Sequence, residues 1–114
     1  GKITYLDMTL IQRSNDYIMA GYINKIQYVA LQMMIARHCF MNPGKFNHYV
    51  NNLHVYDRHM EAMYELLNKT PLEKQPMLSL NPKAHSFYLM NVDDFKVSNV
   101  DNITKIISPL EIAI

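Results

Sequence analysis

The segment from Tyr22 to Cys39 most constrains the fold, because it is long, rich in apolar residues and bounded by helix-ending residues. Its apolar side chains recur at intervals of three and four, which predicts one helix. Other apolar residues fall between these positions, so we expect the helix to be covered on most sides. Asn42-Pro43-Gly44 follows, and Pro and Gly just beyond the last periodic residue end a helix. Four interruptions make the segment too polar to span a bilayer, namely Lys25, Gln27, Gln32 and Arg37.

Alternating patterns precede and follow this helix. The segment from Lys2 to Gln12 predicts a strand, because Leu6, Met8 and Leu10 share one face by period two. From Lys45 to Tyr56 the alternation returns, and a second strand there places His54 and Tyr56 on one face. These two strands would flank the helix in the sequence.

The second half of the chain predicts shorter elements. Asp57 is suited to be the N-cap of a second helix, whose apolar residues continue to Leu67 before Asn68-Lys69-Thr70-Pro71. Short apolar runs follow at residues 77–80, 87–91 and 95–100. We expect the tail from Pro109 to Ile114 to form a last strand.

Length and composition limit the class of protein. At 114 residues we expect one domain with one core. A net charge of +1 argues against a nucleic-acid binder, which usually has a clustered basic face. One cysteine allows no internal disulfide, which favours a reducing, cytoplasmic location.

A polar cluster follows the first strand directly: Gln12-Arg13-Ser14-Asn15-Asp16. Ligands usually bind at strand ends in α/β sheets. A guanidinium and an adjacent hydroxyl together suit a phosphate or carboxylate. The competing interpretation is a solvated or ion-paired surface arginine.

Other reactive residues support no site by their spacing. His54 falls on a strand and His59 on the next helix, so they form no metal-binding pair, and we predict no metal. Cys39 and His38 are adjacent on a helix and point about 100° apart. Cys39 is therefore predicted to be a core or helix-end residue and not a nucleophile.

Taken together, the polar cluster, Asn24, His54-Val55-Tyr56 and Arg58-His59 resemble the C-terminal half of the thymidylate synthase family. The resemblance runs without gaps from Arg13 to Met60 and continues through Asn81-Pro82, residues 92–96 and the ending Ile112-Ala113-Ile114. It implies that residues 1–114 form a thymidylate synthase-like C-terminal domain, part of a longer chain. The implied fold is α/β, with a mixed sheet packed on a long buried helix.

The family's chemistry is transfer of a one-carbon unit from 5,10-methylenetetrahydrofolate to C5 of dUMP. Carried over by position, the substrate-binding residues are Gln12, Arg13, Ser14, Asn24, His54 and Tyr56. Arg13 and Ser14 would hold the phosphate, Asn24 would read the uracil edge, and His54 with Tyr56 would bind the 3′-hydroxyl. Folate contacts would come from Asp16, Ala20 and the tail at Ala113.

Departures from the family pattern leave alternatives open. The family's Leu-Gly-x-Pro-Phe-Asn turn is Met19-Ala20-Gly21-Tyr22-Ile23-Asn24 here, which alters the predicted folate turn. The family's Pro-Cys-His nucleophile segment is not in this sequence, so no catalytic residue is assigned and activity of this chain is an open question. A pyrimidine hydroxymethylase and a non-catalytic nucleotide-binding or interaction module are the alternatives.

The resemblance also implies partners. Family members are homodimers packed through the sheet, so we expect a homodimer or association with the missing half. The predicted ligand is dUMP or a related pyrimidine deoxynucleotide, and no nucleic-acid or membrane partner is predicted.

Overall fold

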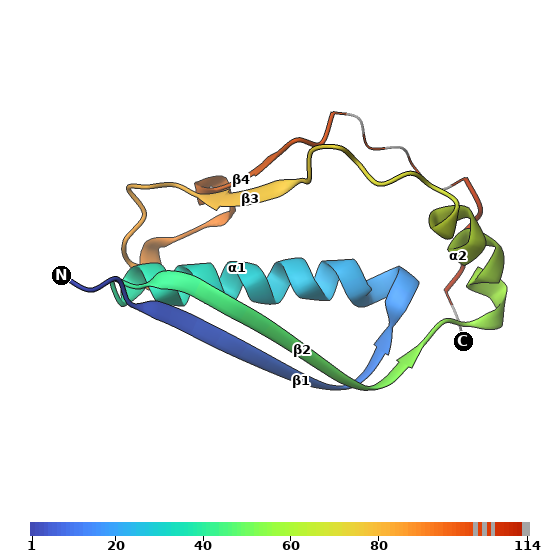
Figure 1. Ribbon diagram of the computed structural model, residues 1–114, viewed down its shortest axis with the longest axis horizontal. Coiled ribbons are helices and arrows are strands. Elements are labelled where there is room, and N and C mark those ends of the chain that lie inside the picture. The colour runs from blue at the N-terminus through green and yellow to red at the C-terminus, as the bar shows by residue number, and fades with distance from the viewer. Residues whose placement is uncertain (102, 104, 106, 113–114) are drawn as a thin grey trace.

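The computed structural model describes residues 1–101, 103, 105 and 107–112, and Figure 1 shows their arrangement. The chain begins with β1 (Tyr5–Asp16), a π-helical turn (Tyr17–Gly21) and the long helix α1 (Tyr22–His38). It continues with β2 (Asn42–His54), a 3-10 turn (Asp57–His59) and α2 (Met60–Leu67). Two short strands follow, β3 (Met77–Leu80) and β4 (Phe95–Ser98), with 3-10 turns at residues 87–89 and 92–94 between them.

The strands β1 and β2 form a parallel pair, and α1 is the connection between them. Their register runs from Tyr5 opposite Asn42 to Asp16 opposite His54, with an irregularity between Leu6 and Met8. Parallel strands need a long crossover because both must run in the same direction. The predicted strand–helix–strand order is thus confirmed, and β1 extends four residues beyond the predicted end at Gln12.

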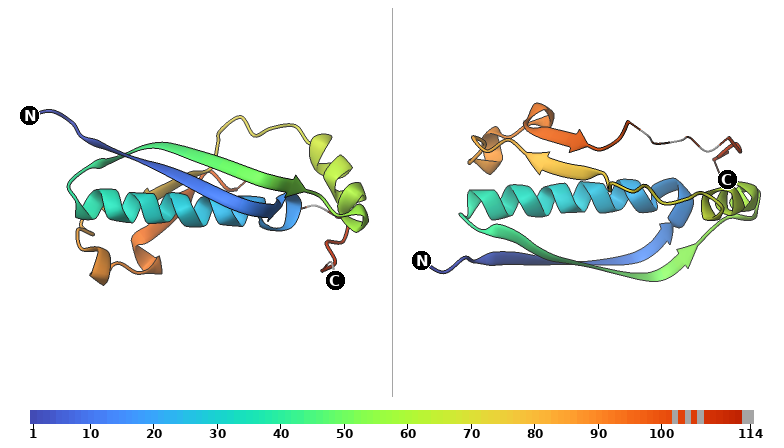
Figure 2. Two further views of the ribbon diagram at one scale, coloured as in Figure 1. Left: turned by 90° about the horizontal axis from the view of Figure 1, so that it is seen from below. Right: turned by 45° about the horizontal axis from the view of Figure 1, so that its top comes forward.

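Helix α1 lies between this pair and the antiparallel pair of β3 and β4, as Figure 1 and the two views of Figure 2 show. Gln32 is almost fully buried on α1, and its Nε2 donates to the carbonyl oxygens of Leu6 at 2.8 Å and Lys45 at 3.0 Å. One side chain therefore ties the middle of the helix to both parallel strands. The α/β class is confirmed, with one parallel and one antiparallel sheet.

The C-terminal end of α1 is joined to the layer of β3 and β4. Arg37 Nη1 donates to the carbonyl oxygens of Asn81 at 2.8 Å and Ala84 at 3.2 Å. The backbone N–H of Phe87 donates to His38 Nδ1 at 3.0 Å. The first turns of α1 are less covered by other elements than its C-terminal end, and the side chains of Ile23 and Ile26 are exposed.

The C-terminal segment lies along α2. Glu65 accepts hydrogen bonds from the backbone N–H groups of Ile107 at 2.7 Å and Ser108 at 3.0 Å, and from the Ser108 hydroxyl at 2.8 Å. Arg58 Nη1 donates to the carbonyl oxygen of Ile112 at 2.8 Å. The buried imidazole of His59 hydrogen-bonds the carbonyl oxygen of Glu111.

Two local predictions are wrong. Asp57 begins a 3-10 turn instead of capping a helix, and α2 starts three residues later, at Met60. Of the strand expected from Pro109 to Ile114, the described residues 109–112 form no strand, because Arg58 and His59 of the turn before α2 hydrogen-bond two of their carbonyl oxygens. The last two residues of that predicted strand lie outside the described residues. Across the part of the chain that is described, none of the helices has both the length and the hydropathy of a membrane span.

Candidate functional site

The predicted site lies where β1 and β2 both end. Because the strands are parallel, their carboxyl ends reach the same edge of the sheet, which is the usual place for a ligand in such folds. Ser14 pairs with Asn52 there, and Asp16 pairs with His54. The π-helical turn then brings the start of α1, and Asn24 with it, back to this edge.

A cluster of three carboxamides and one imidazole forms at this edge. Gln12 Nε2 donates to Asn24 Oδ1 at 3.2 Å, so two predicted substrate residues are in direct contact. Asn15 Nδ2 donates to Gln12 Oε1 at 2.9 Å and to Asn24 Oδ1 at 3.1 Å. His48 Nε2 lies 2.8 Å from Gln12 Oε1. We call Gln12, Asn15, Asn24 and His48 the amide cluster.

A row of aromatic rings follows the end of β2. The rings of His54 and Tyr56 meet edge to face with centroids 5.1 Å apart, which confirms the expectation that these two residues lie together. Tyr56 meets His59 in the same way at 6.1 Å. His54 Nδ1 lies 3.2 Å from the carbonyl oxygen of Asn52. The register opposite Asp16 places this row beside the end of β1.

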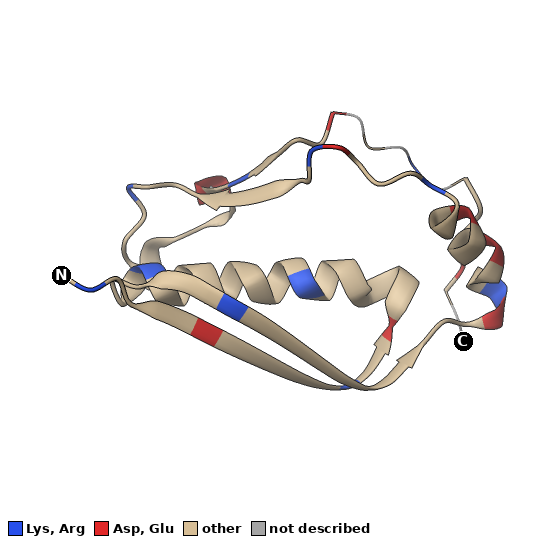
Figure 3. Ribbon diagram, viewed as in Figure 1, with Lys and Arg blue, Asp and Glu red and all other residues tan. Residues whose placement is uncertain are grey.

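Arg13 and Ser14 leave β1 on different faces. Burial alternates along the strand, with Gln12 and Ser14 half-buried and Arg13 exposed. Arg13 is therefore not part of the amide cluster, although its backbone is at the shared edge. Acidic and basic side chains are spread over the molecule, and Figure 3 shows no basic face, in agreement with the small net charge.

The residues predicted to contact folate have separate surroundings. Asp16 Oδ1 accepts from the backbone N–H of Met19 at 3.4 Å and so caps the π-helical turn. Ala20 is half-buried within that turn. Ala113 lies outside the described residues. Gly21 is buried beside them, and a Cβ there would approach Asn15 Oδ1 to 3.3 Å, so this close packing favours glycine.

A cavity of about 250 Å³ opens beside the amide cluster. Its walls come from the end of β1, the π-helical turn, α1 and β2, and they include Asn15, Tyr17, Lys25 and His48. The pKa of Tyr22, next along the chain from this wall, is raised by a hydrogen bond with Tyr17 and by burial. The cavity is lined by two members of the amide cluster that sequence reasoning did not select as site residues, Asn15 and His48, and its lining includes none of the predicted substrate-binding residues.

Both missed residues left a signal in the sequence. Asn15 belongs to the polar cluster, and His48 shares a strand face with His54 by period two. The contact of His48 with Gln12, however, depends on how β1 and β2 pair, and the contact of Asn15 with Asn24 depends on how α1 returns to the end of β1.

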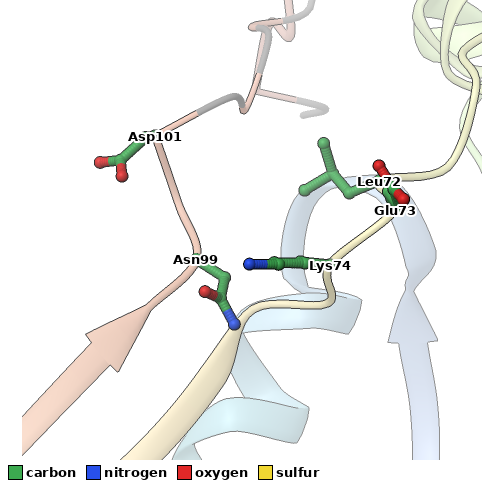
Figure 4. A pocket seen from close by; sticks show the side chains of 5 residues that line it. All are labelled: Leu72, Glu73, Lys74, Asn99 and Asp101. Atoms are coloured by element: carbon green, nitrogen blue, oxygen red, sulfur yellow. The ribbon is translucent and has the colours of Figure 1, made fainter.

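Other hollows lack these features. Figure 4 shows one of about 340 Å³ near the loop before β3, lined by Leu72, Glu73, Lys74, Asn99 and Asp101. Four of these five side chains are exposed, and Leu72 is half-buried. Among the described residues, no group of three or more His, Cys, Asp or Glu side chains could hold a metal ion.

Comparisons with known proteins agree on one family. A family model described as thymidylate synthase matches residues 2–112. A thymidylate synthase of Streptococcus pyogenes serotype M5 (strain Manfredo) is 48% identical over 104 residues, which is 90% of this chain and 37% of that protein. One from Lactococcus lactis subsp. cremoris (strain SK11) is 49% identical over 100 residues, covering 87% of this chain and 36% of that protein.

The fold gives the same result. The solved structure of thermostable thymidylate synthase A from Bacillus subtilis superposes with a TM-score of 0.79 at 32% identity, over 86% of this chain and 35% of that one. The chain thus spans little more than a third of the relatives that it matches. On the family model and on these identities together, the chain belongs to the thymidylate synthase family.

Proposed function

We propose that this chain is the dUMP-binding part of a thymidylate synthase-type enzyme, which transfers a one-carbon unit from methylenetetrahydrofolate to C5 of dUMP. The main support is the convergence of the amide cluster and the His54–Tyr56 ring pair on one sheet edge. Family membership supplies the reaction class. The roles proposed for single residues follow the family pattern by position, and the geometry described above is compatible with them.

Asn24 is the proposed reader of the base. Its carboxamide is fixed by two hydrogen bonds at Oδ1, so its orientation is set before a ligand arrives. His54 and Tyr56 are the proposed contacts of the sugar hydroxyl. Both carry a polar group on a ring held by the neighbouring ring, and such prior ordering lowers the entropy cost of binding.

Arg13 and Ser14 are the proposed phosphate ligands. Ser14 is on the half-buried face with Gln12, and Arg13 is on the exposed face. A phosphate bound by both residues would lie at the edge of β1, because the long side chain of Arg13 can extend around that edge from the exposed face. The guanidinium can then offer two parallel N–H donors to the phosphate.

The nucleophile of the family reaction has no counterpart at this edge. Cys39 is the only cysteine of the chain, and it lies fifteen residues beyond Asn24, at the opposite end of α1. At 1.5 Å per residue this is about 22 Å. The attacking thiolate would therefore come from another segment of the parent enzyme, and we expect this chain by itself to bind but not to turn over.

Asp16 and Ala20 are the described residues that would hold methylenetetrahydrofolate, which supplies the one-carbon unit when bound. The fit is partial, because one oxygen of Asp16 already accepts the N–H of Met19. A donor on the folate would have to share the carboxylate with this N–H, at one of its remaining acceptor sites. We therefore expect folate to add less binding energy here than the nucleotide does.

Calorimetric titration of the full chain with dUMP tests the proposal. We expect saturable binding, and weaker binding of deoxyuridine, which lacks the phosphate. A second titration with dUMP in the presence of folate measures the added contribution of Asp16 and Ala20. Equal affinity for dUMP and deoxyuridine would contradict the phosphate assignment, and no binding of either would overturn the proposal.

A further inference from the structure

The amide cluster has a direction, because its hydrogen bonds form a consistent series of donors and acceptors. His48 and Asn15 donate to Gln12 Oε1, and Gln12 and Asn15 donate to Asn24 Oδ1. Both acceptor oxygens are thus shared by two donors. Asn24 Nδ2 is left for the nucleotide, since the described residues provide no hydrogen bond to it.

Turning the carboxamide of Asn15 or Asn24 by 180° would break two of these contacts, and turning that of Gln12 would break three. If Asn15 alone turned, its Oδ1 would face the oxygens of Gln12 and Asn24. If Asn24 alone turned, its Nδ2 would face the amide nitrogens of Gln12 and Asn15. Such donor–donor and acceptor–acceptor contacts are unfavourable, and they are more so at a partly buried site.

Only a reversal of all three carboxamides keeps every contact paired. Asn24 Nδ2 would then donate to Gln12 and Asn15, and Gln12 Nε2 would donate to His48 Nε2. That last bond requires an unprotonated Nε2 on His48, whereas the observed direction requires a proton there. The position of one proton on His48 therefore separates the two directions, and the atom that Asn24 turns outward differs between them.

The observed direction leaves Asn15 Oδ1 buried and without a hydrogen-bond partner among the described residues. An unpaired buried acceptor is costly. In return, both N–H groups of Asn15 hold the oxygens of Gln12 and Asn24 in place. The observed arrangement therefore fixes the orientation of Gln12 and Asn24 but leaves Asn15 Oδ1 without a hydrogen bond.

We propose that Asn15 and His48 are positioning residues that set the base specificity of the site, by holding Asn24 with its Nδ2 donor outward. An outward donor matches the 4-oxo group of a uracil-type base and meets another donor on the 4-amino group of a cytosine-type base. The acceptor of Asn24 is used within the cluster. This inference rests on the proposed binding of a pyrimidine nucleotide and adds how the base is selected.

The variant Asn15→Asp tests it directly. Aspartate has the same shape but offers only acceptors when ionised, so Gln12 and Asn24 must turn their nitrogens toward it. We expect the ratio of dUMP to dCMP affinity to fall by about tenfold or more, equivalent to one 1.4 kcal/mol step. Repulsion between the new charge and the phosphate weakens both nucleotides alike and cancels in this ratio. An unchanged ratio would overturn the proposal.

Asn47→Asp is the matched control. Asn47 is exposed on β2 next to His48, so this substitution adds the same charge outside the amide cluster. The ratio of dUMP to dCMP affinity of this variant should equal that of the unmodified chain.

A second pair of variants tests His48. His48→Phe keeps a ring but loses the donor and should lower the ratio, whereas His48→Gln keeps an N–H donor and should restore most of it. A similar loss in both variants would indicate a packing role and contradict the proposal.

A measurement without ligand separates this inference from the proposed function. Side-chain amide hydrogen exchange, followed by NMR on the unmodified chain, should show slow exchange for Asn15 and fast exchange for Asn24. Protection of Asn24 and not of Asn15 would overturn the proposed direction even if the chain binds neither nucleotide. Absence of nucleotide binding with the expected exchange pattern would instead refute the proposed function alone.

Discussion

Arg13 is the residue for which the structure gives the sharpest single-site prediction. It is exposed on β1, so its removal leaves no cavity and should not disturb folding. Arg13→Ala should weaken dUMP binding by roughly 1.5–3 kcal/mol, the usual cost of losing a hydrogen bond to a charged group. Calorimetric titration measures this loss. Lys45→Ala is the control, because Lys45 is an exposed cation near the other end of the same sheet; an equal loss in both variants would indicate general charge attraction.

At the same scale, the sequence predicted the site residues that belong to local patterns. His54 and Tyr56 were placed together by their spacing of two, and their rings are in contact. The contact between Gln12 and His48 joins residues 36 positions apart, so it depends on the pairing of β1 with β2. A pattern within one strand contains no information about that register. The role of His48 in the amide cluster therefore became apparent only with the fold.

Gly44 shows how one position constrains an element. It sits near the start of β2, and a Cβ there would collide with Asp7 Oδ1 and come within 3.2 Å of the Leu6 carbonyl oxygen. Asp7 Oδ1 also accepts the N–H of Lys45 at 2.7 Å. Gly44→Ala should destabilise the chain by about 1–3 kcal/mol, as overpacking does. Urea unfolding measures the change, and Gly1→Ala, with no neighbour within 4 Å, should leave the midpoint unchanged.

Glu65 fastens the C-terminal segment to α2, and this contact should depend on pH. Hydrogen bonds from the N–H groups of Ile107 and Ser108 lower the pKa of Glu65 below its ordinary value of 4.5. A lowered pKa means that the contact stabilises the docked segment above pH 4.5 and is lost as pH falls through the lowered value.

Amide hydrogen exchange at Ile107 and Ser108 checks this. Protection should persist at neutral pH, weaken in acid and be lost in Glu65→Gln at neutral pH, because a neutral amide accepts less strongly. Glu61→Gln changes an exposed glutamate on the same helix and should have no effect. Full protection in Glu65→Gln would contradict the assignment.

The short elements in the second half of the chain differ in how well the sequence predicted them, because some depend on local pattern and others on tertiary contacts. The short apolar run predicted at residues 77–80, between a proline and an asparagine, has the bounds of β3, although its type of structure was not predicted. The described part of the expected C-terminal strand, residues 109–112, is not a strand, because Arg58 and His59 hydrogen-bond the carbonyl oxygens of Ile112 and Glu111. Strand propensity ranks local preference, and packing against a neighbouring element overrides it.

The whole molecule has far more exposed surface than a compact chain of its mass. Its accessible area is 9061 Å², whereas a compact monomer of this mass exposes about 6,500 Å². Its radius of gyration is 16.7 Å, against about 13 Å for a compact domain. On the outer face of β1 and β2, Ile11 is 81% exposed and Tyr49 opposite it 63%.

Such a surface should drive association. We expect sedimentation velocity to show dimers or larger species at micromolar concentration, because exposed apolar side chains on the outer face of β1 and β2 favour association. Ile11→Lys should shift the chain toward monomer, because it places a charge at the centre of the outer sheet face. Ile107→Lys, at a position outside that face that is at least as exposed, is the control. A monomer at all concentrations would contradict the expectation.

The parallel pairing of β1 with β2 has a consequence for the order of folding. Tyr5 pairs with Asn42 and Asp16 with His54, so every rung of the ladder joins residues 37 or 38 positions apart. No rung can form until α1 has closed that loop, and contacts of such long range slow folding. During synthesis, β1 must wait unpaired until β2 has left the ribosome. The sheet edge that carries the amide cluster therefore forms late, when the two strands join.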